Sequence, residues 1–234
     1  MLRSAYVGAM RTLAVPLRFA GVLPSFERAP RHSFRFWFAS QFAIHDPVAL
    51  VRLDMPWWTL SAIDAVERWI AARNGDVRAF EYGSGASTVW LARRCTDVVT
   101  VEHDAGFANY VAPLLARDNI RLKLVEPAQN VSAPVAGSGR HGFEHADFAA
   151  YVDTIADGTL YDLVIIDGRA RVACLKRAQE FLGPGGLIVF DNSDRRRYRD
   201  ALSRVRAVRY RGWAPALPYP SETSLIELAN GHAS

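Results

Sequence analysis

One stretch of ten residues, 79–88, constrains the fold more than any other part of the chain. It reads AFEYGSGAST, an apolar run followed by two glycines and then by small polar residues. Gly83 and Gly85 permit a sharp turn and a close approach to a ligand, because neither carries a Cβ atom. Ser87 and Thr88 are residue types that favour a helix N-cap. The stretch predicts a buried strand, a tight turn and a helix whose first N–H groups face whatever lies over the turn.

The remaining sequence alternates short apolar or β-branched segments with segments of helical periodicity. Strands that alternate with helices imply a doubly wound α/β fold with a mostly parallel sheet, here of seven strands. The last two strands follow each other directly and predict an antiparallel hairpin at one edge. We predict strands at residues 77–82, 98–102, 120–125, 161–168 and 187–190, with two more between 208 and 228. We predict helices at residues 59–73, 87–94, 105–118, 146–157, 170–182 and 194–207.

With 234 residues, the chain is long enough for one sizeable domain and an N-terminal extension. Residues 1–58 are rich in aromatic side chains and look irregular, so we predict a cap over an edge or a face of the main domain, residues 59–234. The cap is a candidate for part of the substrate wall, although ordinary packing also explains its rings. The loop 126–145, rich in Gly, Ser, Ala and Pro, is long enough to predict a lid.

The net charge of +4 comes from two basic segments. Residues 1–60 hold seven Arg residues against three acids, and residues 195–211 hold eight against one. Arginines and prolines interrupt the apolar residues 1–30, which argues against a secretory leader. Two interpretations of this segment stay open: a helix packed on the domain, or a peripheral membrane contact through residues 1–28.

The sequence also bears on location. There is no run of eighteen apolar residues, so we expect no transmembrane span. Cys95 and Cys174 lie in predicted helices and lack metal-like spacing. We therefore predict two buried thiols and a reducing, cytoplasmic compartment.

Four carboxylates stand at the predicted ends of four strands, and they belong to Glu81, Glu102, Asp167 and Asp191. In doubly wound sheets, ligands bind outside the carboxyl ends of the strands, where the winding reverses. We therefore predict that the four side chains converge on one crevice. Taken singly, each carboxylate could equally cap a nearby helix.

The turn excludes two classes of nucleotide site. A dinucleotide fingerprint needs Gly or Ala at the sixth position of G-x-G-x-x-G, and this chain has Thr88 there. A phosphate-binding P-loop needs a Gly-Lys-Ser/Thr sequence, which does not follow. Glu102, about twenty residues beyond the turn, is suited to accept hydrogen bonds from a ribose diol. The pattern predicts a ligand with a ribose and without a pyrophosphate, which weakens the interpretation as a nicotinamide oxidoreductase.

These residues resemble a known family. The motif Glu81-x-Gly83-x-Gly85-x-Ser87, followed by Val-Glu-His-Asp at 101–104, looks like the class I S-adenosylmethionine-dependent methyltransferases over residues 77–228. It is most similar to a bacterial subgroup that distantly resembles the plant glucuronoxylan O-methyltransferases. The resemblance implies a Rossmann-like methyltransferase domain that binds S-adenosylmethionine.

The resemblance also implies roles for individual residues. The turn, from Gly83 and Gly85 to Ser87 and Thr88, would lie against the methionine part of the cofactor, with Glu81 near its ammonium group. Glu102, together with His103, would face the ribose. Asp167 would line the methionine side. Glu126, just after the third strand, is the candidate for the adenine contact.

Two chemical routes fit the sequence. In the first, Asp167, Asp191 and Asn192 hold Mg²⁺ or another divalent cation, as they resemble the ligands of catechol-type O-methyltransferases. The catalytic lysine of that family is not matched, because Gly168, Arg169 and Ala170 follow the first aspartate. Alternatively, Asp191 and Asn192 cap the helix that follows.

The second route needs no metal. Here Asp167 or a histidine (His103, His141 or His145) is the base, and Arg169 orients an anionic acceptor. We expect O-methylation of a small-molecule or saccharide hydroxyl. The alternatives are a non-catalytic binding module of the same fold, or an RNA methyltransferase that uses the arginine-rich helix. Nucleic acid is not the expected partner, because no RNA-binding appendage and no Asn-Pro-Pro-Tyr motif are evident.

Overall fold

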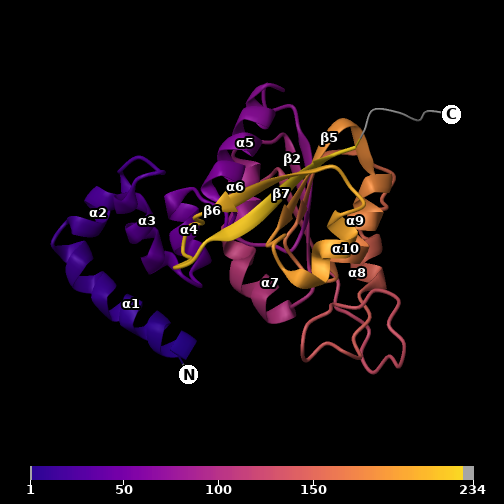
Figure 1. Cartoon of the computed structure of the whole chain (residues 1–234), viewed down its shortest axis with the longest axis horizontal. Helices are drawn as coiled ribbons and strands as arrows, with labels where there is room; N and C mark the ends of the chain where they lie inside the picture. The colour runs from indigo at the N-terminus through magenta and orange to yellow at the C-terminus, as the bar shows by residue number, and fades with distance from the viewer. Residues whose placement is uncertain (1, 229–234) are drawn as a thin grey trace.

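The computed structural model describes residues 2–228 and contains a seven-stranded sheet flanked by helices (Figure 1). Residue 1 and residues 229–234, which the predicted cap and domain include, lie outside the described residues. The strand order across the sheet is β3-β2-β1-β4-β5-β7-β6. The strands are β1 (Arg78–Tyr82), β2 (Asp97–Glu102), β3 (Ile120–Leu124), β4 (Tyr161–Ile166), β5 (Leu182–Asp191), β6 (Ala207–Gly212) and β7 (Ser221–Glu227).

This topology confirms the predicted doubly wound fold. Strands β1 to β5 are parallel, while β7 pairs antiparallel with β5 and β6 pairs antiparallel with β7. The chain first winds from β1 to β3 and then returns to β4 on the other side of β1. The winding therefore reverses between β1 and β4, which is where such sheets bind ligands.

Helices cover both faces of the sheet (Figure 1). On β4, Leu163 and Ile165 pack into one hydrophobic cluster, whereas Val164 and Ile166 pack into the other. Because alternate residues of a strand point to opposite faces, both faces of this central strand are apolar. The first cluster lies under α5 (Leu60–Ala71) and α6 (Ala86–Ala92), and the second under α8 (Ala149–Asp153) and α9 (Arg171–Glu180).

The N-terminal segment is helical, so the prediction of an irregular cap is wrong in this respect. Its helices are α1 (Leu2–Phe19), α2 (Val22–Glu27), α3 (Phe34–Ser40) and α4 (Pro47–Leu53), with a 3₁₀ turn at Gln41–Ala43. Local signals explain two of the helix starts: the Ser33 side chain accepts from the N–H of Phe36, and Asp46 accepts from Ala49. The aromatic composition hid these short helices, because their apolar residues also serve tertiary contacts.

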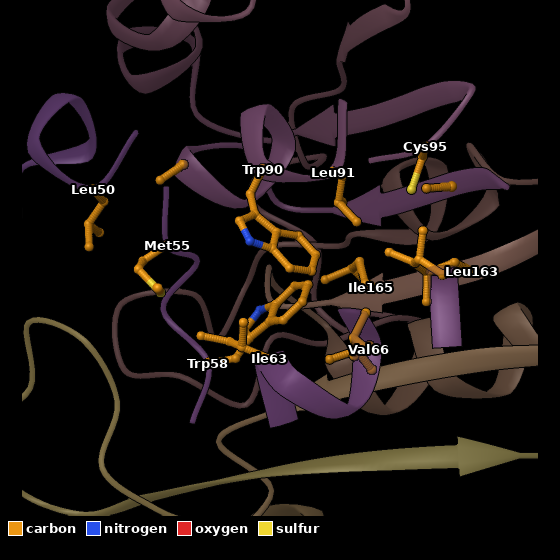
Figure 2. Close-up of a cluster of buried hydrophobic side chains, with 14 of the residues drawn as sticks. Leu50, Met55, Trp58, Ile63, Val66, Trp90, Leu91, Cys95, Leu163 and Ile165 are labelled. Carbon is orange, nitrogen blue, oxygen red and sulfur yellow. The ribbon is translucent and has the colours of Figure 1, made fainter. Parts of the chain in front are cut away.

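The segment 34–58 packs into the core of the main domain. Trp58 is fully buried, and its ring meets that of Trp90 edge to face, with centroids 5.4 Å apart. Figure 2 shows these two indoles facing each other between Met55 and Ile165. The extension also contacts the C-terminal part of the chain, because the indole N–H of Trp37 donates to the carbonyl of Leu217 at 3.2 Å.

Several helices are shorter than predicted. The helix predicted at 105–118 is α7 (Ala105–Val111) and gives way to a 3₁₀ turn at Ala112–Leu114, because Pro113 cannot donate a backbone hydrogen bond. The helix predicted at 194–207 is a 3₁₀ turn, Arg196–Tyr198, followed by the short α10 (Arg199–Leu202). Likewise, α8 keeps only the middle of the predicted helix 146–157.

Two further predictions concern location. Cys95 and Cys174 are both buried free thiols, as predicted. Among the helices of residues 2–228, none is long and apolar enough to cross a membrane.

Candidate functional site

The glycine turn lies where β1, β4 and α6 meet. Gly83 has a φ of +97°, and a Cβ atom placed there would come within 2.9 Å of the Cα of Gly168, in the turn after β4. A Cβ atom at Gly168 would in turn lie 2.1 Å from the Tyr151 hydroxyl. Gly85 differs, because a Cβ atom at this residue would point into open space. Gly83 and Gly168 thus allow the ends of β1 and β4 to come together, and Gly85 leaves room above the turn.

The start of α6 differs from the prediction, because Gly85 is the N-cap. The hydroxyls of Ser87 and Thr88 instead donate to the two carboxyl oxygens of Glu81, each at 2.5 Å. The backbone N–H of Gly85 donates to the Thr88 hydroxyl at 2.9 Å. Burial raises the pKa of Glu81 to about 8. Glu81 thus ties the strand to the helix beneath the turn.

Glu102 ends β2 beside this turn, and four donors hold its carboxylate. One oxygen accepts from the N–H and the hydroxyl of Ser84, both at 3.1 Å. The other accepts from the N–H groups of His103 at 2.8 Å and Asp104 at 3.0 Å. Burial alone would raise the pKa of Glu102, but the hydrogen bonds and the nearby His103 ring hold it below its ordinary value. Glu102 is therefore an ionised acceptor fixed at the edge of the turn.

A cavity of about 440 Å³, which we call the first cavity, opens over the turn. Glu81 and Thr88 are buried beneath it and do not line it, and the exposed Glu126 does not line it either. The sequence-predicted residues that do line it are Gly83, Gly85, Ser87, Glu102, His103, Asp167 and Arg169. These seven come together from the ends of β1, β2 and β4.

The loop between β3 and α8, for which the sequence predicts a lid, supplies a further wall of the first cavity. In Figure 1 this loop extends below α8. Its residues Arg140 and Phe143 line the first cavity. The Arg169 guanidinium lies over the Phe143 ring, 5.0 Å from its centroid, and donates to Nε2 of His103 at 3.3 Å. The length of the loop predicted a lid, but only its aromatic residue could have suggested which side chain forms the wall.

The other two candidate bases lie away from this cavity. His141 is exposed, and its Nδ1 lies 2.9 Å from the carboxylate of Glu144 in the same loop. His145 is exposed as well. Neither histidine lines the first cavity, so of the three histidines only His103 lies beside the turn.

A second cavity, of about 330 Å³, adjoins the first. Trp57, Asp167 and Arg195 line both cavities. Two segments distant in sequence close the second cavity. Ile44 and His45 belong to the N-terminal segment, and residues 216–221 comprise the loop before β7 and the first residue of that strand. The cap therefore does form part of a cavity wall, in addition to its packing role. Sequence reasoning missed Trp57, because only the folded chain brings it to this place. It did place the arginine run that begins at Arg195 near the rim of the site, shortly after Asp191 and Asn192.

Arg171 is the most consequential residue that the sequence did not reveal. Its buried guanidinium lies between two of the predicted metal ligands, 2.7 Å from Oδ1 of Asp167 and 4.0 Å from Oδ2 of Asp191. It also donates to the backbone carbonyls of Asp167, Gly168 and Asp191. The Asp191 carboxyl accepts from the Thr223 hydroxyl at 2.8 Å, and burial together with Asp167 raises the pKa of Asp191 to about 7.

These residues do not fit a divalent cation. A cation bound to both carboxylates would have to lie about 2.0–2.6 Å from their oxygens, where the Arg171 guanidinium already lies. The amide oxygen of Asn192 is already occupied, because it accepts a hydrogen bond from the Arg195 guanidinium. Within the described part of the chain, no group of three or more His, Cys, Asp or Glu side chains could hold a metal ion.

The sequence matches no protein-family model and no curated protein. Solved structures do match the fold. They include the cofactor-bound Rv0187 from MTB (21% identity, TM-score 0.52), which covers 78% of this chain and 87% of that one. Two others are O-methyltransferases. TomG from Streptomyces achromogenes, in complex with SAM, has 18% identity and a TM-score of 0.51, covering 79% of this chain and 88% of its own.

The second is an O-methyltransferase from Bacillus cereus in complex with SAH, with 16% identity and a TM-score of 0.51. The match covers 77% of this chain and 90% of the Bacillus chain. At these identities the likeness shows the fold. The chain therefore has the Rossmann-like fold of the S-adenosylmethionine-dependent methyltransferases, with the first cavity at the switch point where this fold binds ligands.

Proposed function

We propose that this protein is an S-adenosylmethionine-dependent O-methyltransferase that acts on a hydroxyl group of a small molecule or saccharide. The observation that carries the proposal is the pair of joined cavities at the carboxyl ends of β1, β2 and β4. The first has the ionised Glu102 beside a glycine turn, and Asp167 lies where the first meets the second. Such a pair suits a cofactor and an acceptor that must meet at one point.

The first cavity suits the cofactor on chemical grounds. S-adenosylmethionine carries an ammonium group and a ribose diol, and a fixed carboxylate such as Glu102 can accept from the diol. The open space over Gly85 leaves room for close backbone contact. His103 and Phe143 offer ring faces for a purine. Glu81, being buried below the turn, supports Ser87, which lines the cavity.

Asp167 is the proposed base. Bound S-adenosylmethionine would supply an electrophilic methyl group. The acceptor oxygen would form the new C–O bond as the bond from the methyl carbon to sulfur breaks and S-adenosylhomocysteine leaves, and the oxygen would lose its proton to a base. Burial raises the pKa of Asp167, although the nearby Arg171 opposes this effect. The raised pKa makes the Asp167 carboxylate a better proton acceptor. Arg171 holds this carboxylate in place, so the proton has a fixed destination at the junction of the cavities.

A second residue to assign is the arginine that orients the acceptor. The sequence suggested Arg169, which lines the first cavity but not the second. Arg195 lines both and is exposed, so it is better placed to meet an acceptor. We assign Arg169, which contacts His103 and Phe143, to the cofactor side. Nothing in the described residues favours the alternative of a non-catalytic binding module.

Calorimetric titration with S-adenosylmethionine and with NAD⁺ tests the proposal. We expect micromolar binding of the former and none of the latter. Glu102→Ala should weaken S-adenosylmethionine binding about ten-fold or more, because a charged acceptor of two hydrogen bonds is lost. Asp118→Ala is the matched control, since that exposed acid lies outside the cavity and has no predicted role in cofactor binding. Tight binding of NAD⁺ would contradict the proposal, and equal binding by Glu102→Ala and the wild type would remove Glu102 from the ribose role.

A further inference from the structure

A third, smaller cavity of about 180 Å³ lies beyond the second, between the turn after β5 and the edge of the sheet. Four arginines line it, together with Ser193, Asp194 and Glu222: Arg195, Arg199, Arg209 and Arg211. Arg209 and Arg211 are two residues apart on β6, so their side chains lie on the same face of that strand. Arg195 and Arg199 come from the turn and from the start of α10. Two unrelated segments therefore bring four guanidinium groups to one place.

Most of these cations have no partner. Among residues 2–228, Arg199, Arg209 and Arg211 form no ion pair and no side-chain hydrogen bond, and Arg195 donates only to Asn192. The lining holds four guanidinium groups and two carboxylates, those of Asp194 and Glu222, so two positive charges are left uncompensated. Glu222, opposite Arg211 on β7, already accepts from the Ser193 hydroxyl at 2.9 Å. Like charges that converge without a partner are unfavourable, and an anion would relieve this repulsion.

The third cavity continues the acceptor side of the proposed active site. Asp194 and Arg195 line both the second and the third cavity. Asp167, the proposed base, lines the second but not the third. A molecule that presents a hydroxyl to Asp167 could therefore extend past Arg195 into the arginine cavity. The cavity is several times larger than the roughly 30 Å³ share of one water molecule, so it has room for a tetrahedral oxyanion.

We infer that the arginine cavity binds a phosphate monoester group of the methyl acceptor, an inference that rests on the proposed function. Two uncompensated positive charges match the charge of −1.5 to −2 that such a group carries near neutral pH. Arginine offers paired donors to phosphate oxygens, which lysine cannot do. The anchored phosphate fixes the distance between the charged end of the acceptor and the hydroxyl that is methylated.

The test uses inorganic phosphate as the probe and calorimetry as the readout, at low salt. Arg209→Gln/Arg211→Gln removes two guanidinium groups of the cavity. Arg204→Gln/Arg206→Gln removes two exposed arginines of the same segment that do not line it, so both variants lose the same charge. We expect the first variant to bind phosphate about ten-fold more weakly than the wild type, and the second to change less than about two-fold. Equal weakening in both variants, or no phosphate binding by the wild type, would overturn the inference.

Further experiments distinguish a phosphate group of the acceptor from free phosphate and from RNA. Sulfate should bind equally at pH 5.5 and 7.5, whereas phosphate should bind more tightly at pH 7.5, where it gains its second charge. In turnover assays, the wild type and Arg204→Gln/Arg206→Gln should methylate a phosphorylated saccharide faster than its dephosphorylated form, and Arg209→Gln/Arg211→Gln should not. Free phosphate that activates the dephosphorylated form would show an effector site instead and sink the inference. The inference would also be contradicted if a short RNA bound more tightly than phosphate and if both double variants weakened RNA binding equally.

Titration of the same variants with S-adenosylmethionine keeps the two proposals apart. Arg209 and Arg211 do not line the first cavity, so both double variants should bind S-adenosylmethionine as the wild type does. If the wild type does not bind S-adenosylmethionine but the phosphate results hold, the proposed function fails while the anion site stands. If S-adenosylmethionine binds and phosphate does not, only the anion site is lost.

Discussion

At the scale of single residues, buried carboxylates behave differently according to their donors. Glu81 accepts two hydroxyl hydrogen bonds and has its pKa raised to about 8, whereas Glu102 accepts three backbone N–H groups and has its pKa lowered. Both residues are buried. At Glu102 the His103 side chain, together with the backbone N–H groups, favours the charged form strongly enough to offset burial. Glu102 is therefore the acid suited to hold a ligand, and Glu81 the one suited to hold the fold.

Glu81 makes the stability of the unliganded protein depend on pH. Its folded pKa of about 8 lies above the ordinary value of 4.5, so the unfolded chain binds fewer protons between these values. Stability is thus fully present below pH 4.5 and is lost as the pH rises towards 8. Glutamine does not titrate, so the unfolding free energy of Glu81→Gln should not show this loss. Relative to the wild type, it should rise by at most about 1.4 kcal/mol per pH unit over this range. Urea denaturation at a series of pH values measures the trend.

Glu126→Gln is the control for this measurement, because Glu126 is exposed and belongs to the loop after β3. It should show no comparable trend with pH. A difference between Glu81→Gln and the wild type that stays constant from pH 5 to 8 would show that Glu81 is ionised in the folded protein.

At the scale of elements, the loop between β3 and α8 works through one aromatic side chain. Phe143 lines the first cavity and contacts both Arg169 and His103. We expect Phe143→Ala to weaken S-adenosylmethionine binding about three- to ten-fold, in line with the energy of an aromatic contact. The midpoint of thermal unfolding of the unliganded protein should fall less than for a fully buried ring, since Phe143 is only partly buried at the edge of the second hydrophobic cluster.

Val135→Ala in the same loop is the matched control, because Val135 is exposed and does not line the first cavity. The two variants should therefore differ in calorimetric titration, where only Phe143→Ala should lose affinity for S-adenosylmethionine. Equal cofactor affinity in both would mean that the loop does not cover the ligand.

At the scale of the whole molecule, the N-terminal segment and the sheet domain share one hydrophobic core. Trp58 packs against Trp90 on α6 (Figure 2) and belongs to the same cluster as Ile165 of β4. We expect Trp58→Ala to cost about 3–5 kcal/mol of unfolding free energy, as for other buried aromatic residues. Phe19→Ala, at a 96% exposed position of α1, should change it by less than about 0.5 kcal/mol.

Chemical denaturation followed by tryptophan fluorescence and by circular dichroism measures this prediction. The two probes should report one transition, because the segment and the sheet unfold together. A separate early transition in the wild type would contradict the shared core. The membrane contact of residues 1–28 and the cytoplasmic location stay predictions.

Much of the fold could be predicted because it depends on local patterns. Strand β4 was evident from a continuous apolar run, and the β1 turn from Gly83 and Gly85. Helix lengths were less certain, because Pro113 and the arginine-rich stretch before α10 broke periodic segments early. The aromatic N-terminal helices were missed, since their rings are placed for contacts with distant segments and not for a local period.

The sequence by itself determined the order of the strands along the chain and which carboxylates end them, because both follow from short-range pattern. It also placed Glu102 beside the glycine turn. The tertiary structure alone decided which charges meet. Arg171 lies between Asp167 and Asp191, where a metal was one expectation, and Arg195 lies where three cavities join. Such encounters depend on the crossing of elements far apart in the chain, and no local period encodes them.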